Sequence, residues 1–307
     1  MSPLPLPVQI HAAIAAVSPP GELGESPLWH PAEQCLYWCD IPARRLYRLD
    51  PVDGTQRHWE LSTEAACCAP ALSGGLVLGM RDGLWRFDPH TGERTLIEPA
   101  PYDPARERYN DGKCDAQGRM WAGTIYEPRD RAAAALYRCD RRGLQRMAGG
   151  ITTSNGLAWS LDGATMYWAD TKAHAIHALD VDMADGSLSR QRVWRQFPAR
   201  VPDEPLDDYA GRPDGAAVDA QGCYWVAMFE GSRVLRLDPQ GRTLAELRLP
   251  VRCPTMPCFG GGDLRTLYIT TARQGRPAAE LASQPLAGCV LALRVDVPGL
   301  PANFAAF

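Results

Sequence analysis

The hydrophobic residues of this chain gather in short runs, separated by turns rich in glycine, aspartate and proline. Six such runs follow a polar turn and carry aromatic or aliphatic residues in corresponding places: Cys35-Leu-Tyr-Trp38, Gly75-Leu-Val-Leu78, Arg119-Met-Trp121, Met166-Tyr-Trp168, Cys223-Tyr-Trp225 and Leu267-Tyr-Ile269. Consecutive runs end 40 to 57 residues apart, on average about 46, which is in the range of a four-stranded propeller blade.

A second series of runs follows the first in the same order. Its members are Leu46-Tyr-Arg-Leu-Asp50, Leu84-Trp-Arg-Phe-Asp88, Leu136-Tyr-Arg-Cys-Asp140, Ile176-His-Ala-Leu-Asp180, Val234-Leu-Arg-Leu-Asp238 and Val290-Leu-Ala-Leu-Arg294. The two series predict the second and third strands of each blade in an all-β fold, a six-bladed β-propeller of four-stranded antiparallel meanders.

The repeats occupy most of the chain. Because six units of about 46 residues leave little for a second domain, we expect residues 1–307 to form a single β-propeller domain. The segment Val8–Ile14 has strand character. We expect it to pair with the last blade, so that an N-terminal strand closes the ring and removes an exposed sheet edge.

Composition and charge narrow the function classes. The 28 glycines and 27 prolines suit a fold with many turns, and 32 basic against 36 acidic residues give a net charge of −4. Nucleic-acid binders usually show a basic excess, so this balance argues against a nucleic-acid partner. No apolar run approaches the roughly 18 residues that span a membrane, and the proline-broken start does not resemble a secretory signal.

The ten cysteines include no C-x-x-C pair, which gives a zinc cluster or a disulfide framework little support. We therefore expect mostly buried thiols in a reducing cytoplasm. We also expect a monomer or weak homo-oligomer.

Three long connections, 124–135, 197–211 and 271–288, are expected on one face of the propeller, where binding and catalysis tend to lie. The sequence does not fix their conformations.

Four polar residues occupy corresponding places ahead of the strand-two runs. Glu25 and Asn155 lie 13 residues before Trp38 and Trp168, while Asn110 and Asp214 lie 11 residues before Trp121 and Trp225. Equivalent positions in a propeller converge on its axis, so these side chains would form a common site of hard oxygen donors for calcium or another divalent cation. The competing interpretation is that Asn155-Gly156, Asp214-Gly215 and Asn110-Asp-Gly112 are simply turns.

Several segments resemble one known family. They are Gly24-Glu-Ser-Pro27, Arg108-Tyr-Asn-Asp-Gly-Lys113 with Trp121-Ala-Gly-Thr124, Ser154-Asn-Gly-Leu157 and Arg212-Pro-Asp-Gly215. The chain thereby resembles the regucalcin (senescence marker protein)/gluconolactonase/luciferin-regenerating-enzyme family from about Gly21 to about Val297.

The resemblance implies hydrolysis of a sugar (aldono-) lactone to the free aldonic acid. It implies one divalent metal ion held by Glu25, Asn155 and Asp214, calcium or zinc, with manganese or ferrous iron as further options. It also implies that Asp214 activates water and that Arg108 and Asn110 contact the substrate. Glu127 is a further substrate-binding candidate, displaced by about one position from the place where some members carry a glutamate.

Two alternatives stay open: a non-catalytic calcium-binding regulator, and a phosphotriester or aryl-ester hydrolase on the same propeller. A serine hydrolase is disfavoured because no Gly-x-Ser-x-Gly segment occurs.

Overall fold

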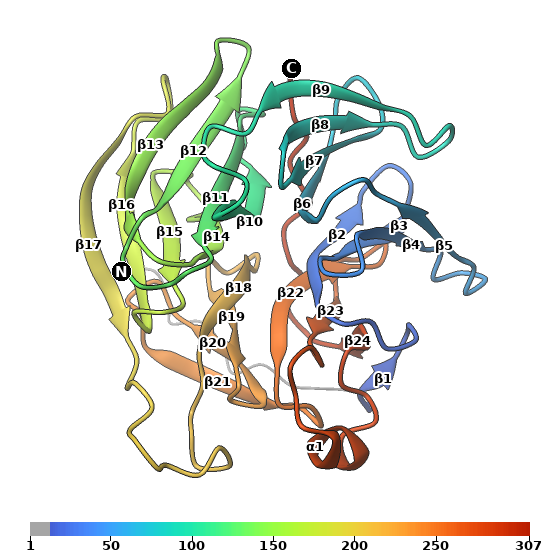
Figure 1. The fold of residues 1–307 in the computed structure, drawn as a ribbon, viewed down its shortest axis with the longest axis vertical. Coiled ribbons are helices and arrows are strands. Elements are labelled where there is room, and N and C mark those ends of the chain that lie inside the picture. The colour runs from blue at the N-terminus through green and yellow to red at the C-terminus, as the bar shows by residue number, and fades with distance from the viewer. Residues whose placement is uncertain (1–12) are drawn as a thin grey trace.

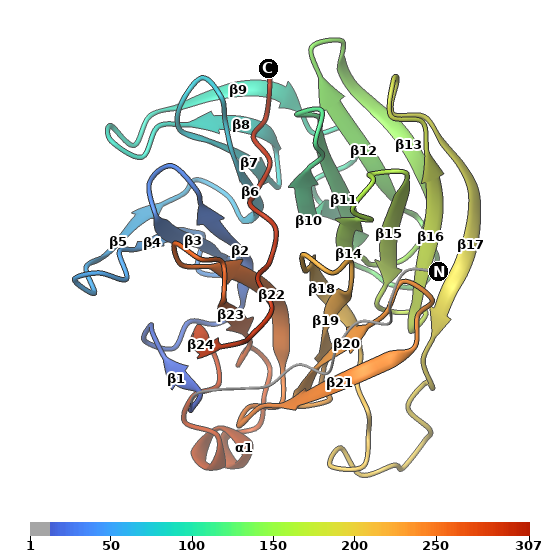
Figure 2. The same cartoon turned by 180° about the vertical axis from the view of Figure 1, so that it is seen from behind.

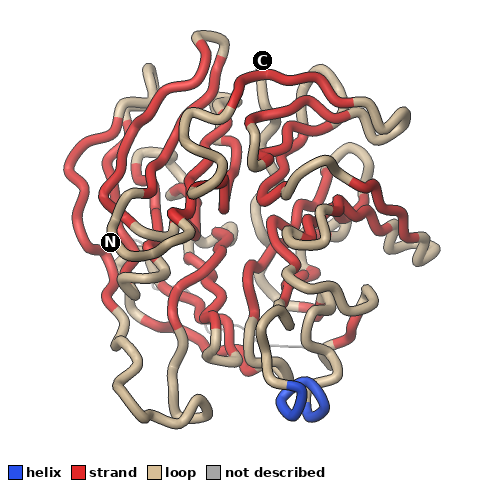
Figure 3. Tube along the Cα trace, in the orientation of Figure 1, coloured by secondary structure: helices blue, strands red, loops and turns tan. Residues whose placement is uncertain are grey.

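The structure is a computed structural model, and it describes residues 13–307. Six four-stranded antiparallel sheets are arranged around a central axis, which confirms the six-bladed β-propeller (Figure 1). Strands and connecting loops make up almost all of the described chain, with one short helix (Figure 3). No helix of residues 13–307 is long and apolar enough to cross a membrane.

Five blades are consecutive meanders. Blade 1 contains β2 (Gly24–His30), β3 (Cys35–Asp40), β4 (Arg45–Leu49) and β5 (Gln56–Glu60). Blade 2 contains β6 (Ala65–Pro70), β7 (Leu76–Met80), β8 (Gly83–Phe87) and β9 (Arg94–Pro99). Blade 3 contains β10 (Glu107–Cys114), β11 (Met120–Tyr126), β12 (Ala134–Asp140) and β13 (Gly143–Ile151). Blade 4 contains β14 (Ser154–Trp159), β15 (Thr165–Asp170), β16 (Ala175–Val181) and β17 (Leu188–Gln196). Blade 5 contains β18 (Arg212–Val218), β19 (Tyr224–Phe229), β20 (Arg233–Leu237) and β21 (Thr243–Arg248).

Blade 6 combines three strands from the C-terminal part of the chain with one strand from its N-terminal part. It contains β22 (Pro254–Gly260), β23 (Thr266–Thr271) and β24 (Leu291–Arg294), and its outermost strand is β1 (Ala15–Ala16), which pairs with β24. Closure by an N-terminal strand is thus confirmed, with the pairing residues just beyond the expected segment 8–14, most of which lies outside the described residues. The helix α1 (Ala278–Ser283) lies in the connection between β23 and β24.

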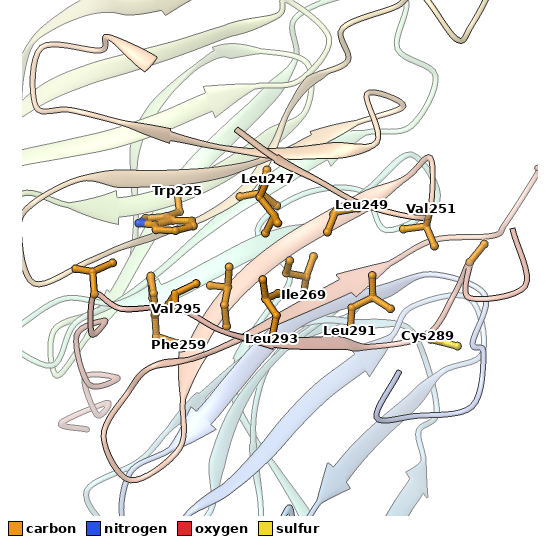
Figure 4. Close-up of a cluster of buried hydrophobic side chains, with 14 residues drawn as sticks. Trp225, Leu247, Leu249, Val251, Phe259, Ile269, Cys289, Leu291, Leu293 and Val295 are labelled. Carbon is orange, nitrogen blue, oxygen red and sulfur yellow. The ribbon is translucent and has the colours of Figure 1, made fainter. Parts of the chain in front are cut away.

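Neighbouring blades pack through apolar side chains that alternate along the strands. Between blades 5 and 6, Trp225 and Leu247 face Ile269 and Leu293 in a buried layer (Figure 4). Trp121 and Trp168 occupy the corresponding layer between blades 3 and 4. The tryptophans of the first repeat series are therefore packing residues, because burial of their large apolar rings holds adjacent blades together.

Two of these tryptophans are held by an aspartate in the preceding turn. In blade 5, Asp219 Oδ2 accepts hydrogen bonds from Trp225 Nε1 at 2.9 Å and Arg236 Nε at 2.8 Å. In blade 3, Asp115 Oδ2 accepts from Trp121 Nε1 at 2.7 Å and from Arg119 Nε. Each carboxylate also accepts hydrogen bonds from two backbone N–H groups of its own turn. The aspartate thereby links the turn, the tryptophan ring and the arginine in one buried hydrogen-bond network.

Candidate functional site

The four polar residues expected at the axis all lie on innermost strands: Glu25 on β2, Asn110 on β10, Asn155 on β14 and Asp214 on β18. All four are more than nine-tenths buried. Each lies at or beside a shift of register between its strand and the next. Such bulges change the direction of a side chain. The four side chains therefore depart from the regular alternation along their strands.

The turn interpretation of the Asn-Gly and Asp-Gly pairs is wrong, because both pairs lie inside strands. The glycines serve close packing instead. Gly156 has a φ of +62°, and a Cβ there would lie 2.3 Å from the Tyr224 hydroxyl. A Cβ on Gly215 would lie 2.4 Å from the Cβ of Met256. The innermost strands β14 and β18 can therefore pack closely against the next blade only because these positions lack side chains.

Glu25 and Asp214 are two buried carboxyl groups without a cationic partner. Neither forms an ion pair with Lys, Arg or His within the described chain. Burial, and then the charges of Asp214 and Asp111, raise the pKa of Glu25 well above its ordinary value. Burial raises the pKa of Asp214 to about 8, with Arg212 opposing the shift and Asp111 adding to it. Mutual repulsion in a buried site is the condition that a bound cation relieves.

The donor chemistry fits a hard divalent cation. Two carboxylates and the amide oxygen of Asn155 are the oxygen ligands that such ions take, with further positions left for water or substrate. No group of three or more His, Cys, Asp and Glu side chains suited to a metal occurs among residues 13–307. This is consistent with the candidate set, in which the third member is an amide.

A chain of hydrogen bonds fixes the Asn155 amide. Its Nδ2 donates to Thr171 Oγ1 at 2.8 Å, and the Thr171 hydroxyl donates to the Pro213 carbonyl at 2.7 Å. Its Oδ1 accepts from Asn110 Nδ2 at 3.0 Å and keeps a second lone pair. Thr171 thus orients the candidate ligand oxygen and ties blade 4 to blade 5. Sequence reasoning missed Thr171, because nothing in the repeat pattern singles it out.

Asn110 lies beside Asn155 and Arg108. Asn110 Nδ2 also donates to the Ser154 carbonyl at 2.9 Å, and its Oδ1 accepts from Arg108 Nη1 at 2.9 Å. Arg108 Nη1 further donates to the Tyr109 carbonyl, whereas Nη2 has no hydrogen-bond partner in the part of the chain that the structure describes. The geometry brings both residues expected to contact substrate to the edge of the carboxylate pair.

Asp111 was also missed, although it lies within the same motif as Asn110. Its Oδ2 accepts from the Leu157 backbone N–H at 2.8 Å, while its buried Oδ1 has no partner among the described residues. Burial raises the pKa of Asp111, which adds a third acidic group to the axis.

Glu127 follows β11 at the start of the long 124–135 connection and forms ion pairs with two arginines. Its two carboxylate oxygens lie 2.9 Å from Arg81 Nη1 and Nη2, and its Oε1 lies 3.4 Å from Arg108 Nε. Glu64 pairs with the other side of Arg81. In this arrangement Glu127 holds Arg108 in place, and its direct contact with a substrate stays a prediction.

Two of the long loops are cross-linked by ion pairs. Glu230 binds Arg212 Nη1 and Arg276 Nη1, both at 2.9 Å. Glu280 on α1 in turn binds Arg276 Nη2 at 2.7 Å and Arg252 Nε at 3.0 Å, and the Arg252 guanidinium reaches the carbonyl of Leu206 in the 197–211 loop. The network runs from β18, which carries Asp214, to α1.

Comparison with known proteins identifies close relatives. The chain is 47% identical over 286 residues to a 6-deoxy-6-sulfogluconolactonase of Pseudomonas putida, covering 92% of this chain and 94% of the relative. It is 35% identical over 288 residues to regucalcin of Danio rerio, covering 91% and 93%. The solved structure of a regucalcin from Agrobacterium tumefaciens, described as a calcium-binding protein, superposes with a TM-score of 0.89 at 26% identity, covering 96% and 98%.

Residues 23–273 match the family described as SMP-30/Gluconolactonase/LRE-like region. This span includes every candidate site residue and all but the last blade's closing strands. The chain therefore belongs to the SMP-30/gluconolactonase/luciferin-regenerating-enzyme family.

Proposed function

We propose that this chain is a sugar lactonase that uses one divalent cation held by Glu25, Asn155 and Asp214. The observation that carries the proposal is the buried pair of carboxyl groups of Glu25 and Asp214, which form no ion pair among residues 13–307. Beside them lie the Asn155 amide, whose orientation is fixed by hydrogen bonds, and Arg108, which has an unused donor. The names of two relatives support it, since one is a lactonase and another is described as calcium-binding.

When bound, a divalent cation would polarise the lactone carbonyl and stabilise the negative charge that develops on it. The chain's own residues supply the rest. Asp214, as the carboxylate, accepts a proton from the attacking water. Arg108 donates from Nη2 to a ring hydroxyl, and Asn110 keeps the guanidinium and the Asn155 amide in register. An all-oxygen ligand set accepts calcium, zinc, manganese or ferrous iron, with calcium or zinc the first to test.

Thr171→Val tests the orientation of Asn155. The substitution removes the hydroxyl that accepts from Asn155 Nδ2 while keeping the side-chain size. We expect the affinity for the cation to fall about 10–100-fold, as is usual when a group that orients a ligand is lost. Activity measured against free metal concentration gives the affinity, and Thr171→Ser should restore it. Equal metal dependence of Thr171→Val and the parent protein would show that Thr171 does not orient the ligand.

The relative that is 47% identical makes a lactone with a sulfonate at C6 the first substrate to test. Arg129 in the 124–135 connection supports an anionic substituent: its charge lowers the pKa of Asp214, and it forms no ion pair within the described residues. We expect Arg129→Met to lower kcat/KM for the sulfonated lactone about tenfold more than for gluconolactone. Equal losses for both lactones would place the sulfonate away from Arg129.

Acid release from a panel of lactones, measured by pH-stat with and without a chelator, separates the proposed function from its alternatives. If the chain is the proposed metal-dependent lactonase, it releases acid from a lactone only when the metal is present. No release from any lactone at saturating metal would favour a calcium-binding regulator. Turnover of a phosphotriester or aryl ester that is faster than turnover of any lactone would favour a phosphotriester or aryl-ester hydrolase.

A further inference from the structure

The central channel contains a chamber on the side away from the candidate site. It has a volume of about 490 Å³, and every innermost strand contributes to its wall. Ala158 on β14 and Ala217 on β18 line it, each three residues beyond the candidate ligands Asn155 and Asp214. Ser26, which follows the candidate ligand Glu25, also lines it, so the chamber extends from just beyond the candidate ligands toward the opposite face of the propeller.

The segment after β24 runs across this face of the propeller toward blade 2 (Figure 2). Residues 300–303 line the chamber. The segment is fixed to blades 2 and 3, because Ala305 N donates to the Pro70 carbonyl at 2.7 Å and Ala306 N donates to the Gly118 carbonyl at 2.9 Å. The chamber is thus built partly by a segment outside the repeats.

The wall and rim of the chamber are mainly apolar. Met256, Phe259 and Trp29 belong to the wall. At the rim, Leu161 and Leu300 are 56% and 41% exposed and extend the apolar surface of the wall to the mouth of the chamber. A pocket of this size with apolar walls and few polar groups has the character of a small-molecule site.

One lysine supplies a positive charge in this apolar space, and the charge of the buried Asp111 acts on it without a direct ion pair. Lys113 lines the chamber, and its Nζ donates to the Ala216 carbonyl at 2.8 Å but forms no ion pair among residues 13–307. The other charged groups of the wall are engaged: Asp115 with Arg119, and Asp162 with Ser160 and the Ala164 N–H. Lys113 is also one of only two lysines in the chain, the other being Lys172.

We propose that the chamber binds one small amphipathic monoanion, a carboxylate or sulfonate on an apolar body, with its anionic group on Lys113. The apolar body would cover the chamber wall and the exposed leucines of the rim. The acid group would accept from the ammonium hydrogens that Ala216 leaves free, a charge-assisted bond that is strong in an apolar environment. This site is independent of the proposed lactonase function.

The test uses two fluorescent probes with the same body, 8-anilinonaphthalene-1-sulfonate and the neutral N-phenyl-1-naphthylamine. We expect the unmodified full chain to bind one sulfonated probe per chain, at least about tenfold more tightly than the neutral probe. Lys113→Met should abolish this difference, whereas Lys172→Met, which removes an exposed lysine, should preserve it. Calcium or chelator should not displace the probe.

The difference in affinity between the two probes is measured on the unmodified protein, so it remains a valid test even if Lys113→Met folds poorly. Thermal unfolding of Lys113→Met shows whether that variant is folded. Equal affinities for the two probes would overturn the proposal, as would several probes per chain, displacement by metal, or a preference that survives Lys113→Met. Loss of lactone hydrolysis has no bearing on these results, so failure of the two proposals can be told apart.

Discussion

Asp214→Asn should lower kcat for lactone hydrolysis about 1000-fold, because the amide cannot accept the proton of the attacking water. Asparagine has the same size as aspartate and keeps one side-chain oxygen at this position of the β18 bulge. The variant should therefore still bind the cation, although more weakly. Steady-state hydrolysis at saturating metal, together with calorimetric metal binding, measures the two effects separately.

The matched control is Asp162→Asn, which changes an exposed turn aspartate on the other side of the channel and should leave kcat unchanged. If Asp214→Asn hydrolysed lactones at the parent rate with metal present, Asp214 would not be the proton acceptor. If it bound no metal at all, its role would be that of a ligand, and the rate loss would carry no information about proton transfer.

Asp219→Ala should destabilise the fold by about 3–5 kcal/mol, the cost of removing one member of a buried ion pair. Asp219 and Arg236 have fully buried side chains, and the same carboxylate accepts from Trp225 Nε1 and from the N–H groups of Gln221 and Cys223. Removing it leaves these donors unsatisfied in the wall between blades 5 and 6. The free energy of unfolding in urea measures the loss.

Asp53→Ala is the matched control, because Asp53 also accepts a backbone N–H in a turn but is exposed. It should leave the free energy of unfolding nearly unchanged, because water replaces the lost acceptor. Asp115→Ala, which removes the corresponding group in blade 3, should resemble Asp219→Ala. A loss for Asp219→Ala no larger than for Asp53→Ala would show that this polar unit is not what holds the blade.

The repeat architecture could be predicted from sequence because each blade repeats the same local pattern. This pattern is a tight turn followed by a strand whose aromatic residue is buried against the next blade. Glu25, Asn155 and Asp214 could be placed at the axis because equivalent positions of a ring converge there. Counting gave no information on side-chain direction. It therefore grouped Asn110 with the candidate metal ligands, whereas in the structure the Asn110 amide nitrogen donates to Asn155 Oδ1.

Contacts between different blades could not be predicted. Arg81 and Glu127 are 46 residues apart and directly follow the second strands of neighbouring blades, but the two repeat series specify no residue type at these positions and so did not predict the pair. Thr171 and the Asn155 amide meet because of the bulge in β14, a local irregularity without a pattern in the residue types. The Asn-Gly and Asp-Gly pairs predicted turns by local propensity, and close approach of the strands at the axis overrode that preference.

The coordination of a bound cation tests the central claim most directly. A crystal structure of the protein loaded with calcium or manganese, with the ion located by anomalous scattering, should place oxygens of Glu25, Asn155 and Asp214 about 2.0–2.6 Å from one ion. A cation bound at another place, or one at the axis that any of these three side chains fails to coordinate, would contradict the account.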